Sequence, residues 1–240
     1  MKKINLGALK IVLVYVILSI AWIFYSDIFI VKYANQRAFF VKISIFKGFF
    51  FIFITAVLLY VLIKRETERR IKIWKYFATY DIMTGAYNRN AGLEILEKIF
   101  EKHKKENKDL SIIYADINNL KQVNDTLGHH EGDRLIINVA DVLKKNIRSS
   151  DYVVRIGGDE FLIILPNCNS LKAENIIIRI KEALKELNLK NQKVDHSVSF
   201  GVASLEDFYK TTDEMIAFAD MMMYKDKKTI KKSIFNQHKK

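Results

Sequence analysis

Three carboxylates in this sequence could form a metal site. Asp116 directly follows the apolar segment 110–115, and Asp159 and Glu160 stand between a Gly-Gly pair and the apolar run 161–165. Mg²⁺ prefers oxygen ligands and commonly binds one or two carboxylates while keeping positions for water and substrate phosphates. A Gly-Gly-Asp-Glu stretch by itself is also consistent with a solvated acidic turn, so the surrounding elements must decide.

Those elements predict an α/β fold of the α+β kind. Without the first and last helices, their order is β-α-β-β-α-β, the ferredoxin-like split βαβ with added helices. Its first strand lies centrally beside a hairpin, so we expect Asp116 to lie close to Asp159 and Glu160. The Gly-Gly pair predicts a tight hairpin turn. The predicted strands are 110–115, 152–156, 161–165 and 196–203, and the predicted helices are 89–104, 132–147, 171–187 and 213–228.

A second polar run, between residues 116 and 133, could recognise a nucleotide base. Asn124 and Asp133 carry the donors and acceptors that pair with a base edge, and a carboxylate can accept from the N–H edge of guanine. The alternative is helix capping and turn formation, to which we expect Asp125 and Gly128 to contribute.

Two apolar segments precede this domain. Residues 6–31 and 48–63, the latter extendable back to residue 39, are each long enough to cross a bilayer core of ~30 Å as helices. A signal peptide is the alternative for the first segment, but it lacks a small-residue cleavage site. We therefore expect two transmembrane helices, joined by an extramembrane loop of roughly ten residues, too short for a folded sensing domain.

Positive residues favour a cytoplasmic location for both chain ends. Lys2, Lys3 and Lys10 lie at the start of the first span, and six Lys and Arg residues follow the second span between residues 64 and 75. Segment 64–80 predicts a charged helix, either a simple spacer or a stalk for a parallel dimer.

The net charge of +12 points to acidic partners such as nucleic acid, anionic lipid or a polyphosphate. The basic tail contains few aromatic residues for base stacking, so we expect lipid or solvent beside it and no nucleic-acid partner. The single cysteine, Cys168, excludes an intrachain disulfide and fits a reducing compartment.

Five segments in order resemble the diguanylate cyclase, or GGDEF, family across roughly residues 80–232. They are DIMTGAYNR at 81–89, the polar run 116–133, GGDEF at 157–161, VSFGV at 198–202, and Ala219-Asp220 with Tyr224 and Lys227. The resemblance implies a homodimeric enzyme that joins two GTP molecules into cyclic di-GMP and releases pyrophosphate. It also implies Mg²⁺, for which Mn²⁺ can substitute.

The resemblance further implies roles for individual residues. Asp116 and Asp159 would bind the metal with the Ile117 carbonyl, and Glu160 would be a further metal-site carboxylate or the base for the 3′-hydroxyl. The remaining assignments are guanine recognition by Asn124 and Asp133, phosphate binding by Lys121, Lys227 and Lys231, and an inhibitory product site of Arg148, Asp151 and Arg179. A surface ion pair is the alternative for Arg148 and Asp151.

The sequence departs from the family pattern at Asn118, Leu120 and the pair Ile230-Lys231. Many members have Asp, Phe and Gly-Arg there, and Lys231 keeps the charge without bidentate phosphate geometry. The expected organisation is a membrane anchor at 1–63, a linker helix at 64–80, the catalytic domain at 81–232 and a basic tail at 233–240, located at the bacterial inner membrane. A catalytically weak receptor for GTP or cyclic di-GMP is the alternative function.

Overall fold

The computed structural model describes residues 6–33, 37–190, 193–205 and 209–237. The chain divides into two compact units, Met1–Lys75 and Tyr76–Lys240. The first holds two long helices, and the second holds a β-sheet with its covering helices.

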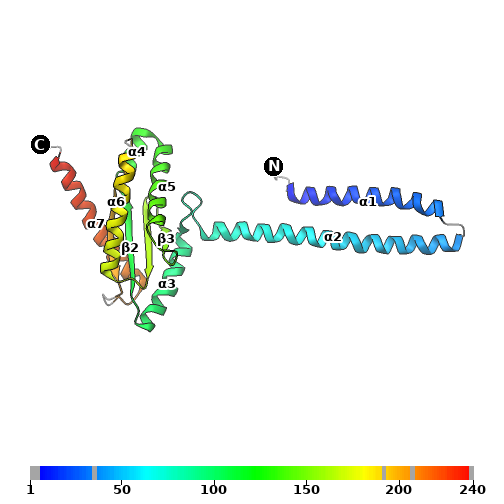
Figure 1. The fold of residues 1–240 in the computed structure, drawn as a ribbon, viewed down its shortest axis with the longest axis horizontal. Helices are drawn as coiled ribbons and strands as arrows, with labels where there is room; N and C mark the ends of the chain where they lie inside the picture. The colour runs from blue at the N-terminus through cyan, green and yellow to red at the C-terminus, as the bar shows by residue number, and fades with distance from the viewer. Residues whose placement is uncertain (1–5, 34–36, 191–192, 206–208, 238–240) are drawn as a thin grey trace. The chain divides into compact units, whose positions relative to one another are not determined.

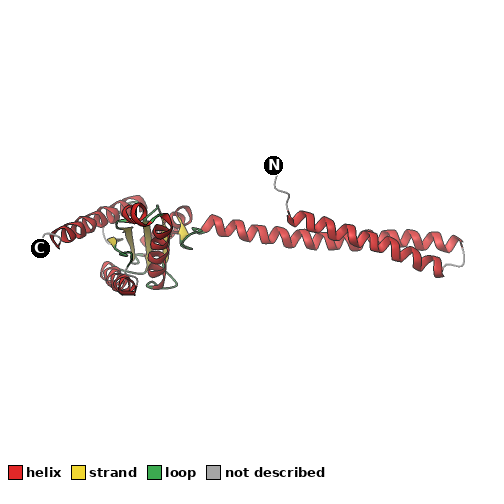
Figure 2. Ribbon diagram, turned by 90° about the horizontal axis from the view of Figure 1, so that it is seen from above, coloured by secondary structure: helices red, strands yellow, loops and turns green. Residues whose placement is uncertain are grey.

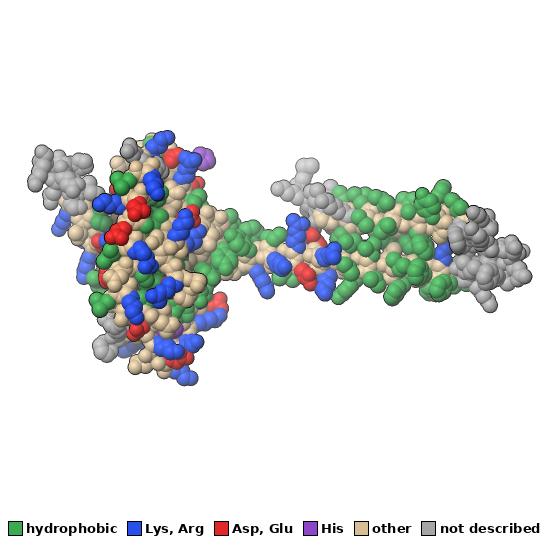
Figure 3. Space-filling view, viewed as in Figure 1, with side chains coloured by type: hydrophobic (Ala, Val, Ile, Leu, Met, Phe, Trp, Pro, Cys, Tyr) green, Lys and Arg blue, Asp and Glu red, His purple; other side chains and the backbone are tan. Residues whose placement is uncertain are grey.

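The first unit is a pair of helices that lie side by side (Figures 1 and 2). Helix α1 spans Leu6–Tyr33, and α2 spans Arg37–Thr79, so that its last residues belong to the second unit. The ring of Trp22 contacts Phe50 and Phe51 across the pair, at centroid distances of 6.0 and 5.6 Å. Hydrophobic side chains cover both helices along most of this unit, and Lys and Arg side chains follow on α2 (Figure 3).

Part of this pair has the length and composition of a membrane span. Within the residues that the structure describes, one helical segment, Ile45–Thr79, is long and apolar enough to cross a membrane. Its most apolar window has a mean hydropathy of 2.4, and 6% of that window is buried. The apolar helical segment Ile11–Ser26 is shorter. The prediction of two spans is therefore supported for the second helix by length and composition, and the first span remains a prediction.

The second unit is built on a five-stranded mixed sheet with the strand order β1-β3-β4-β2-β5. Strands β3, β4, β2 and β5 pair with one another in antiparallel fashion, and β1 adds to the edge in parallel with β3. This is the ferredoxin-like order, so the predicted fold is confirmed. The strands are β1 (Tyr87–Asn88), β2 (Leu110–Ile117), β3 (Tyr152–Arg155), β4 (Glu160–Pro166) and β5 (Val198–Ser204).

Helices cover both faces of this sheet because its central strands are apolar on both sides. All eight residues of β2 are buried, and successive side chains point to opposite faces. Ile113 and Ala115 pack with α5 (His129–Lys145) and α6 (Ser170–Lys190). Ile112 and Tyr114 pack with α3 (Arg89–Glu106) and α7 (Thr212–Gln237). Helices α5 and α6 of the ferredoxin-like core thus cover one face of the sheet, and the added helices α3 and α7 cover the other face.

The hairpin prediction is confirmed, because β3 and β4 pair in antiparallel fashion around a four-residue connection. Neither Gly157 nor Gly158 has a positive φ, so the connection is not one of the two-residue turns that require one. One local prediction is wrong. A short helix, α4 (Leu120–Leu127), contains Asp125, which therefore does not cap a helix. Gly128 does end α4 and begin α5, with a φ of 86° that favours glycine. Strand β1 was not predicted, since two residues carry no periodic pattern.

Gly201 fixes how closely α7 approaches β5. A Cβ atom at this position would lie 2.1 Å from the Ala219 carbonyl oxygen and 2.2 Å from the Met223 backbone nitrogen. Because backbone atoms cannot rotate away, we expect Gly201→Ala to displace α7 and to lower the free energy of unfolding by about 1–3 kcal/mol. Thermal or denaturant unfolding measures this loss.

Gly158→Ala is the matched control, because a Cβ there meets no atom within 4 Å and the backbone has no positive φ. Equal stabilities of the two variants would contradict the close approach of α7.

Candidate active site

The three carboxylates singled out in the sequence meet at one end of the sheet. Strands β2 and β4 pair in a register that places Asp116 opposite Glu160, on the same face. The backbone N–H of Ile117 donates to the Asp159 carbonyl oxygen at 2.9 Å, which attaches the β3–β4 loop to the end of β2. The predicted proximity of Asp116 to Asp159 and Glu160 therefore follows from strand register.

The glycine pair leaves room for the Glu160 side chain. A Cβ atom on Gly157 would lie 2.4 Å from Glu160 Oε2, so any larger residue would displace the carboxylate. The backbone N–H groups of Ile156 and Gly157 both donate to the Glu160 carbonyl oxygen, at 2.9 and 3.3 Å. Close approach, rather than an unusual backbone conformation, is thus the structural need for glycine at position 157.

Lys227 lies against this cluster from α7. Its Nζ donates to Asp116 Oδ1 at 2.6 Å, and Asp116 is 6% exposed. A cation already fits beside the carboxylate that was predicted to bind metal. Lys227 was predicted to bind phosphate, and an ammonium at this position could contact both a carboxylate and a phosphate near it.

Burial and mutual repulsion make these carboxylates costly to ionise. Burial raises the pKa of Asp116, Lys227 lowers it, and the charges of Asp159 and Asp220 raise it further, with a net increase. The pKa of Glu160 is raised first by burial and then by Asp159, Asp116 and Asp220, against a hydrogen bond with Tyr114. Asp116 and Glu160 therefore sit where a bound cation would be stabilised.

Sequence reasoning assigned no role to Asp220 or Tyr114, which both act on this cluster. Asp220 lies on α7 in the last of the five family segments. It stands about two helical turns before Lys227, so the sequence already indicated that both side chains lie on the same face of the helix. Tyr114 lies two residues before Asp116 on β2, so strand alternation puts both on one face. Burial, Glu160 and Asp220 together raise the pKa of the Tyr114 hydroxyl.

The donor set fits a hard divalent cation. The oxygen atoms available are those of Asp116, Asp159 and Glu160 and the Ile117 carbonyl, the type that Mg²⁺ binds. Among the described residues no three His, Cys, Asp or Glu side chains form a ready-made metal-binding group. The remaining ligands would thus come from backbone, water or substrate.

The predicted base-binding residues lie on two consecutive helices. Asn124 is on α4 and Asp133 on α5, and both are half-buried. A Cβ atom on Gly132 would lie 1.9 Å from Asn124 Oδ1, so glycine permits the amide to reach the first turn of α5. Lys121 on α4 and Lys231 on α7 are exposed.

The departure at Asn118 has a structural consequence. Its side chain is 4% exposed and joins the ends of β2 and β5. The amide nitrogen donates to Ser197 Oγ at 3.0 Å, and the amide oxygen accepts from Ser199 Oγ at 2.9 Å. An amide satisfies both hydroxyls without adding a charge to the acidic cluster.

The residues of the predicted product site lie near one another. Asp151 accepts from the Arg148 backbone N–H at 2.8 Å, so its carboxylate closes the turn before β3. The guanidinium of Arg179 on α6 donates to the Asn146 carbonyl oxygen, two residues from Arg148. Among the described residues, Arg148 and Asp151 form no side-chain ion pair, contrary to the alternative considered above.

Comparison with known proteins identifies the family. Residues 78–233, more than half of the chain, match the model described as "Diguanylate cyclase, GGDEF domain". The chain therefore belongs to the GGDEF diguanylate cyclase family.

Two relatives and one solved structure illustrate the similarity. The probable diguanylate cyclase DgcC of Escherichia coli K12 is 35% identical over 164 residues, 68% of this chain and 43% of DgcC. The uncharacterized protein YhcK of Bacillus subtilis is 31% identical over 185 residues, 75% of this chain and 52% of YhcK. The chain thus spans about half the length of these relatives. The GGDEF domain of DgcB from Caulobacter crescentus, in complex with c-di-GMP, has a TM-score of 0.58 and 25% identity, covering 63% of this chain and 89% of that domain.

Repulsion within the acidic cluster should be measurable in stability. Because the folded-state pKa values of Asp116 and Glu160 are raised, their ionisation costs stability at neutral pH, and this cost disappears below about pH 4. We expect Asp159→Asn to raise stability at pH 7 by a few tenths to about 1 kcal/mol, after allowance for solvent screening.

Thermal unfolding at pH 7 and pH 4.5 in the presence of EDTA measures this effect. The stabilisation should shrink as pH falls. A variant that is equally stable at both pH values relative to the native sequence would contradict the repulsion.

Proposed function

We propose that this protein is a membrane-anchored diguanylate cyclase that condenses two GTP molecules into cyclic di-GMP with release of pyrophosphate. The observation that carries this proposal is the β2–β4 register, which sets Asp116 opposite Glu160 and beside the Asp159 loop in a chain of this family. The intact GGDEF segment and the intact Asp116 favour catalysis over a receptor role.

The residues of this chain would divide the work of phosphoryl transfer. Asp116, Asp159 and the Ile117 carbonyl would hold Mg²⁺, which supplies charge neutralisation at the triphosphate when bound. Glu160 would accept the proton of the 3′-hydroxyl or complete the metal site. Burial raises its pKa, and a raised pKa suits a general base working near neutral pH.

Nucleotide positioning would come from the helices around the sheet. Asn124 and Asp133 would pair with guanine, and adenine would leave their buried polar groups unsatisfied at a cost of about 1–3 kcal/mol each. Lys121, Lys227 and Lys231 would bind phosphates. Each domain would then hold one GTP, so a homodimer is required to bring two nucleotides together.

The first unit would anchor the enzyme in the bacterial inner membrane. The helical segment Ile45–Thr79 contains an apolar window long enough for one span, and a second span through α1 would return the chain to the cytoplasmic side. The Lys and Arg residues that follow on α2 favour a cytoplasmic catalytic domain.

Glu160→Gln should abolish product formation, because the amide neither accepts a proton nor offers a charged ligand. The measurement is conversion of labelled GTP to cyclic di-GMP with Mg²⁺ by the full chain in detergent micelles. The matched control, Glu101→Gln, changes an exposed residue of α3 and should retain activity.

Turnover by the Glu160 variant at the native rate would refute the mechanism. Cyclic di-GMP binding by a native protein that forms no product would identify a receptor instead.

We further propose product inhibition at Arg148, Asp151 and Arg179. Guanidinium groups favour bidentate contacts with phosphate, and the DgcB domain with bound c-di-GMP supports product binding in a related fold. Arg148→Ala should leave the initial rate unchanged and raise the final amount of product. The control is Lys185→Ala, which removes an exposed cation from the same helix as Arg179.

Progress curves with added cyclic di-GMP decide the question. If the native protein and Arg148→Ala are equally insensitive to added product, this protein has no such site.

A further inference from the structure

A cavity of about 630 Å³ opens between the start of α1 and the middle of α2. Helix α1 contributes Gly7 and Ile11 to its lining, and α2 contributes residues between Leu62 and Ile73. All of the described lining residues belong to the first unit. The cavity is therefore a feature of the helix pair and is separate from the acidic cluster on the sheet.

This cavity lies where α2 changes from apolar to charged residues. Helices α1 and α2 run antiparallel (Figures 1 and 2), and the Trp22 ring stacks on Phe51 at a centroid distance of 5.6 Å. Moving from this contact toward the start of α1 therefore follows α2 toward its charged part, which begins at Lys64. In an anchored protein this boundary would lie at the cytoplasmic surface of the bilayer.

The lining of the cavity carries an excess of positive charge. Arg65, Arg69 and Arg70 line it, and Glu66 is the only carboxylate among its described lining residues. Arg70 Nε donates to Glu66 Oε1 at 3.0 Å, so this carboxylate already has a partner on its own helix. The first turn of α1, which includes Gly7, contains no acidic residue. The cavity thus offers cations to an anion from outside the chain.

Arg65 and Arg69 are the two cations best placed to share such an anion. They stand one helical turn apart, so both lie on the face of α2 that lines the cavity. Within the described part of the chain, neither guanidinium forms an ion pair. Like charges at this spacing destabilise a helix, and an anion between them would remove that repulsion. Guanidinium groups bind phosphate oxygens through paired hydrogen bonds.

The apolar part of the lining favours a lipid over a soluble anion. Ile11 and Leu62 line the cavity together with the arginines. Beside them in the sequence, Val12 and Ile63 are exposed, so apolar surface continues away from the cavity along both helices. A soluble phosphate compound would use only the cationic side. A phospholipid would use both, with its phosphate at the arginines and its acyl chains along the exposed apolar side chains.

We propose that this cavity binds the head group of an anionic phospholipid from the cytoplasmic leaflet. Basic pockets between membrane helices on that side suit anionic head groups. The proposal rests on the membrane anchoring proposed above and goes beyond it by naming the lipid class and the residues that bind it. The bound phosphate would hold the start of α1 against α2 at the point where α2 leaves the membrane.

The combined substitution Arg65→Gln with Arg69→Gln tests the site. Glutamine is a good helix former, so α2 should remain intact. Because each basic residue beside an anionic lipid contributes about a fivefold factor in binding, we expect the affinity for phosphatidylglycerol to fall roughly 10- to 30-fold. The measurement is native mass spectrometry of the full chain in non-ionic detergent micelles, titrated separately with phosphatidylglycerol and phosphatidylcholine. The native chain should retain one phosphatidylglycerol molecule in preference to phosphatidylcholine.

The matched control removes the same charge from the same helix outside the cavity. Lys64 and Lys72 are exposed on α2 and do not line the cavity. The combined variant Lys64→Gln with Lys72→Gln should keep the native affinity for phosphatidylglycerol. An equal loss in the arginine and lysine variants would show diffuse attraction to a basic helix and would overturn the site.

A second arm separates a lipid from a soluble phosphate compound. Glycerol 3-phosphate carries the phosphate of the lipid without its acyl chains, so it should not displace phosphatidylglycerol at concentrations comparable to those of the lipid. Displacement at equal concentrations would identify a site for soluble phosphate and overturn the lipid assignment.

Membrane association is measured separately, by sedimentation of the native chain with membranes after an alkaline carbonate wash. A chain that stays with the membrane but shows no preference for phosphatidylglycerol overturns this inference alone. A chain released by the wash overturns the proposed anchoring and this inference with it. None of these readouts requires cyclic di-GMP synthesis, so a failure of the proposed enzyme activity remains distinct from both.

Discussion

The acidic cluster at the ends of β2 and β4 is the constraint on which the rest of the second unit depends. Two carboxylates lie directly opposite each other across a strand pair, and a third lies in the loop just before β4. Like charges in such positions destabilise a sheet. The raised pKa values of Asp116 and Glu160 record this cost, which burial dominates.

The surrounding structure accommodates this cost in two ways. Both faces of the sheet are covered, so that the hydrophobic contacts of β2 and β4 stabilise the strands that carry the charges. Helix α7 then brings the Lys227 ammonium to Asp116, and Gly201 allows the close approach of that helix. Gly201 on β5 and Lys227 on α7 therefore both help to place a positive charge beside Asp116.

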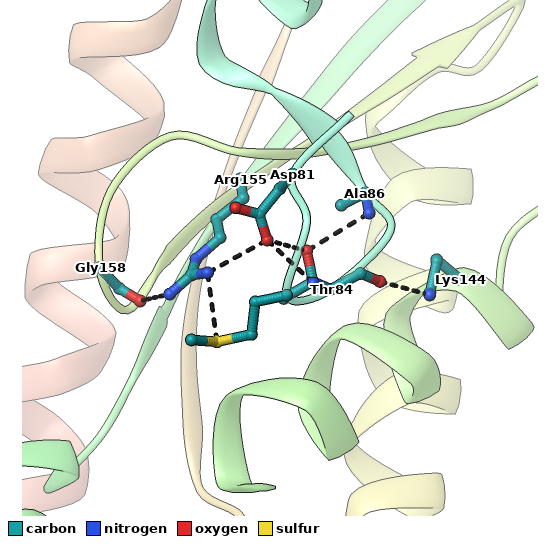
Figure 4. Close-up of polar contacts among 7 residues, drawn as sticks. Asp81, Thr84, Ala86, Lys144, Arg155 and Gly158 are labelled. Carbon is teal, nitrogen blue, oxygen red and sulfur yellow. Dashed lines mark hydrogen bonds and ion pairs between the residues drawn. The ribbon is translucent and has the colours of Figure 1, made fainter. Parts of the chain in front are cut away.

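The turn between α2 and α3 gives the domain a defined entry point. Asn88 satisfies carbonyl groups at the end of α2 and an N–H group at the start of α3, so one side chain fixes the direction of both helices. Asp81 and Arg155 extend this attachment to the loop next to the acidic cluster (Figure 4).

The sequence by itself determined the fold class, the order of the strands and helices of the ferredoxin-like core, and the acidic residues. Each of these depends on local patterns: strand alternation, helical periodicity, and five motifs in a fixed order. The residue-level roles taken from the family resemblance remain predictions, although the structure brings Asp116, Asp159 and Glu160 together and sets Asn124 beside the helix of Asp133.

Only the tertiary structure decided which side chains that are distant in the sequence lie close together. Asp220 and Tyr114 join the acidic cluster because α7 packs across β5 and because β2 lies between β4 and β5. Gly157 is required because the Glu160 carboxylate lies close to it, and not because the turn needs a positive φ. No local sequence pattern distinguishes these two reasons for a glycine. Arg155 and Asp81 lie 74 residues apart, and only the pairing of β1 with β3 brings them within hydrogen-bonding distance. The pairing of distant strands depends on the order of all strands in the sheet, and no short segment of the sequence predicts that order by itself.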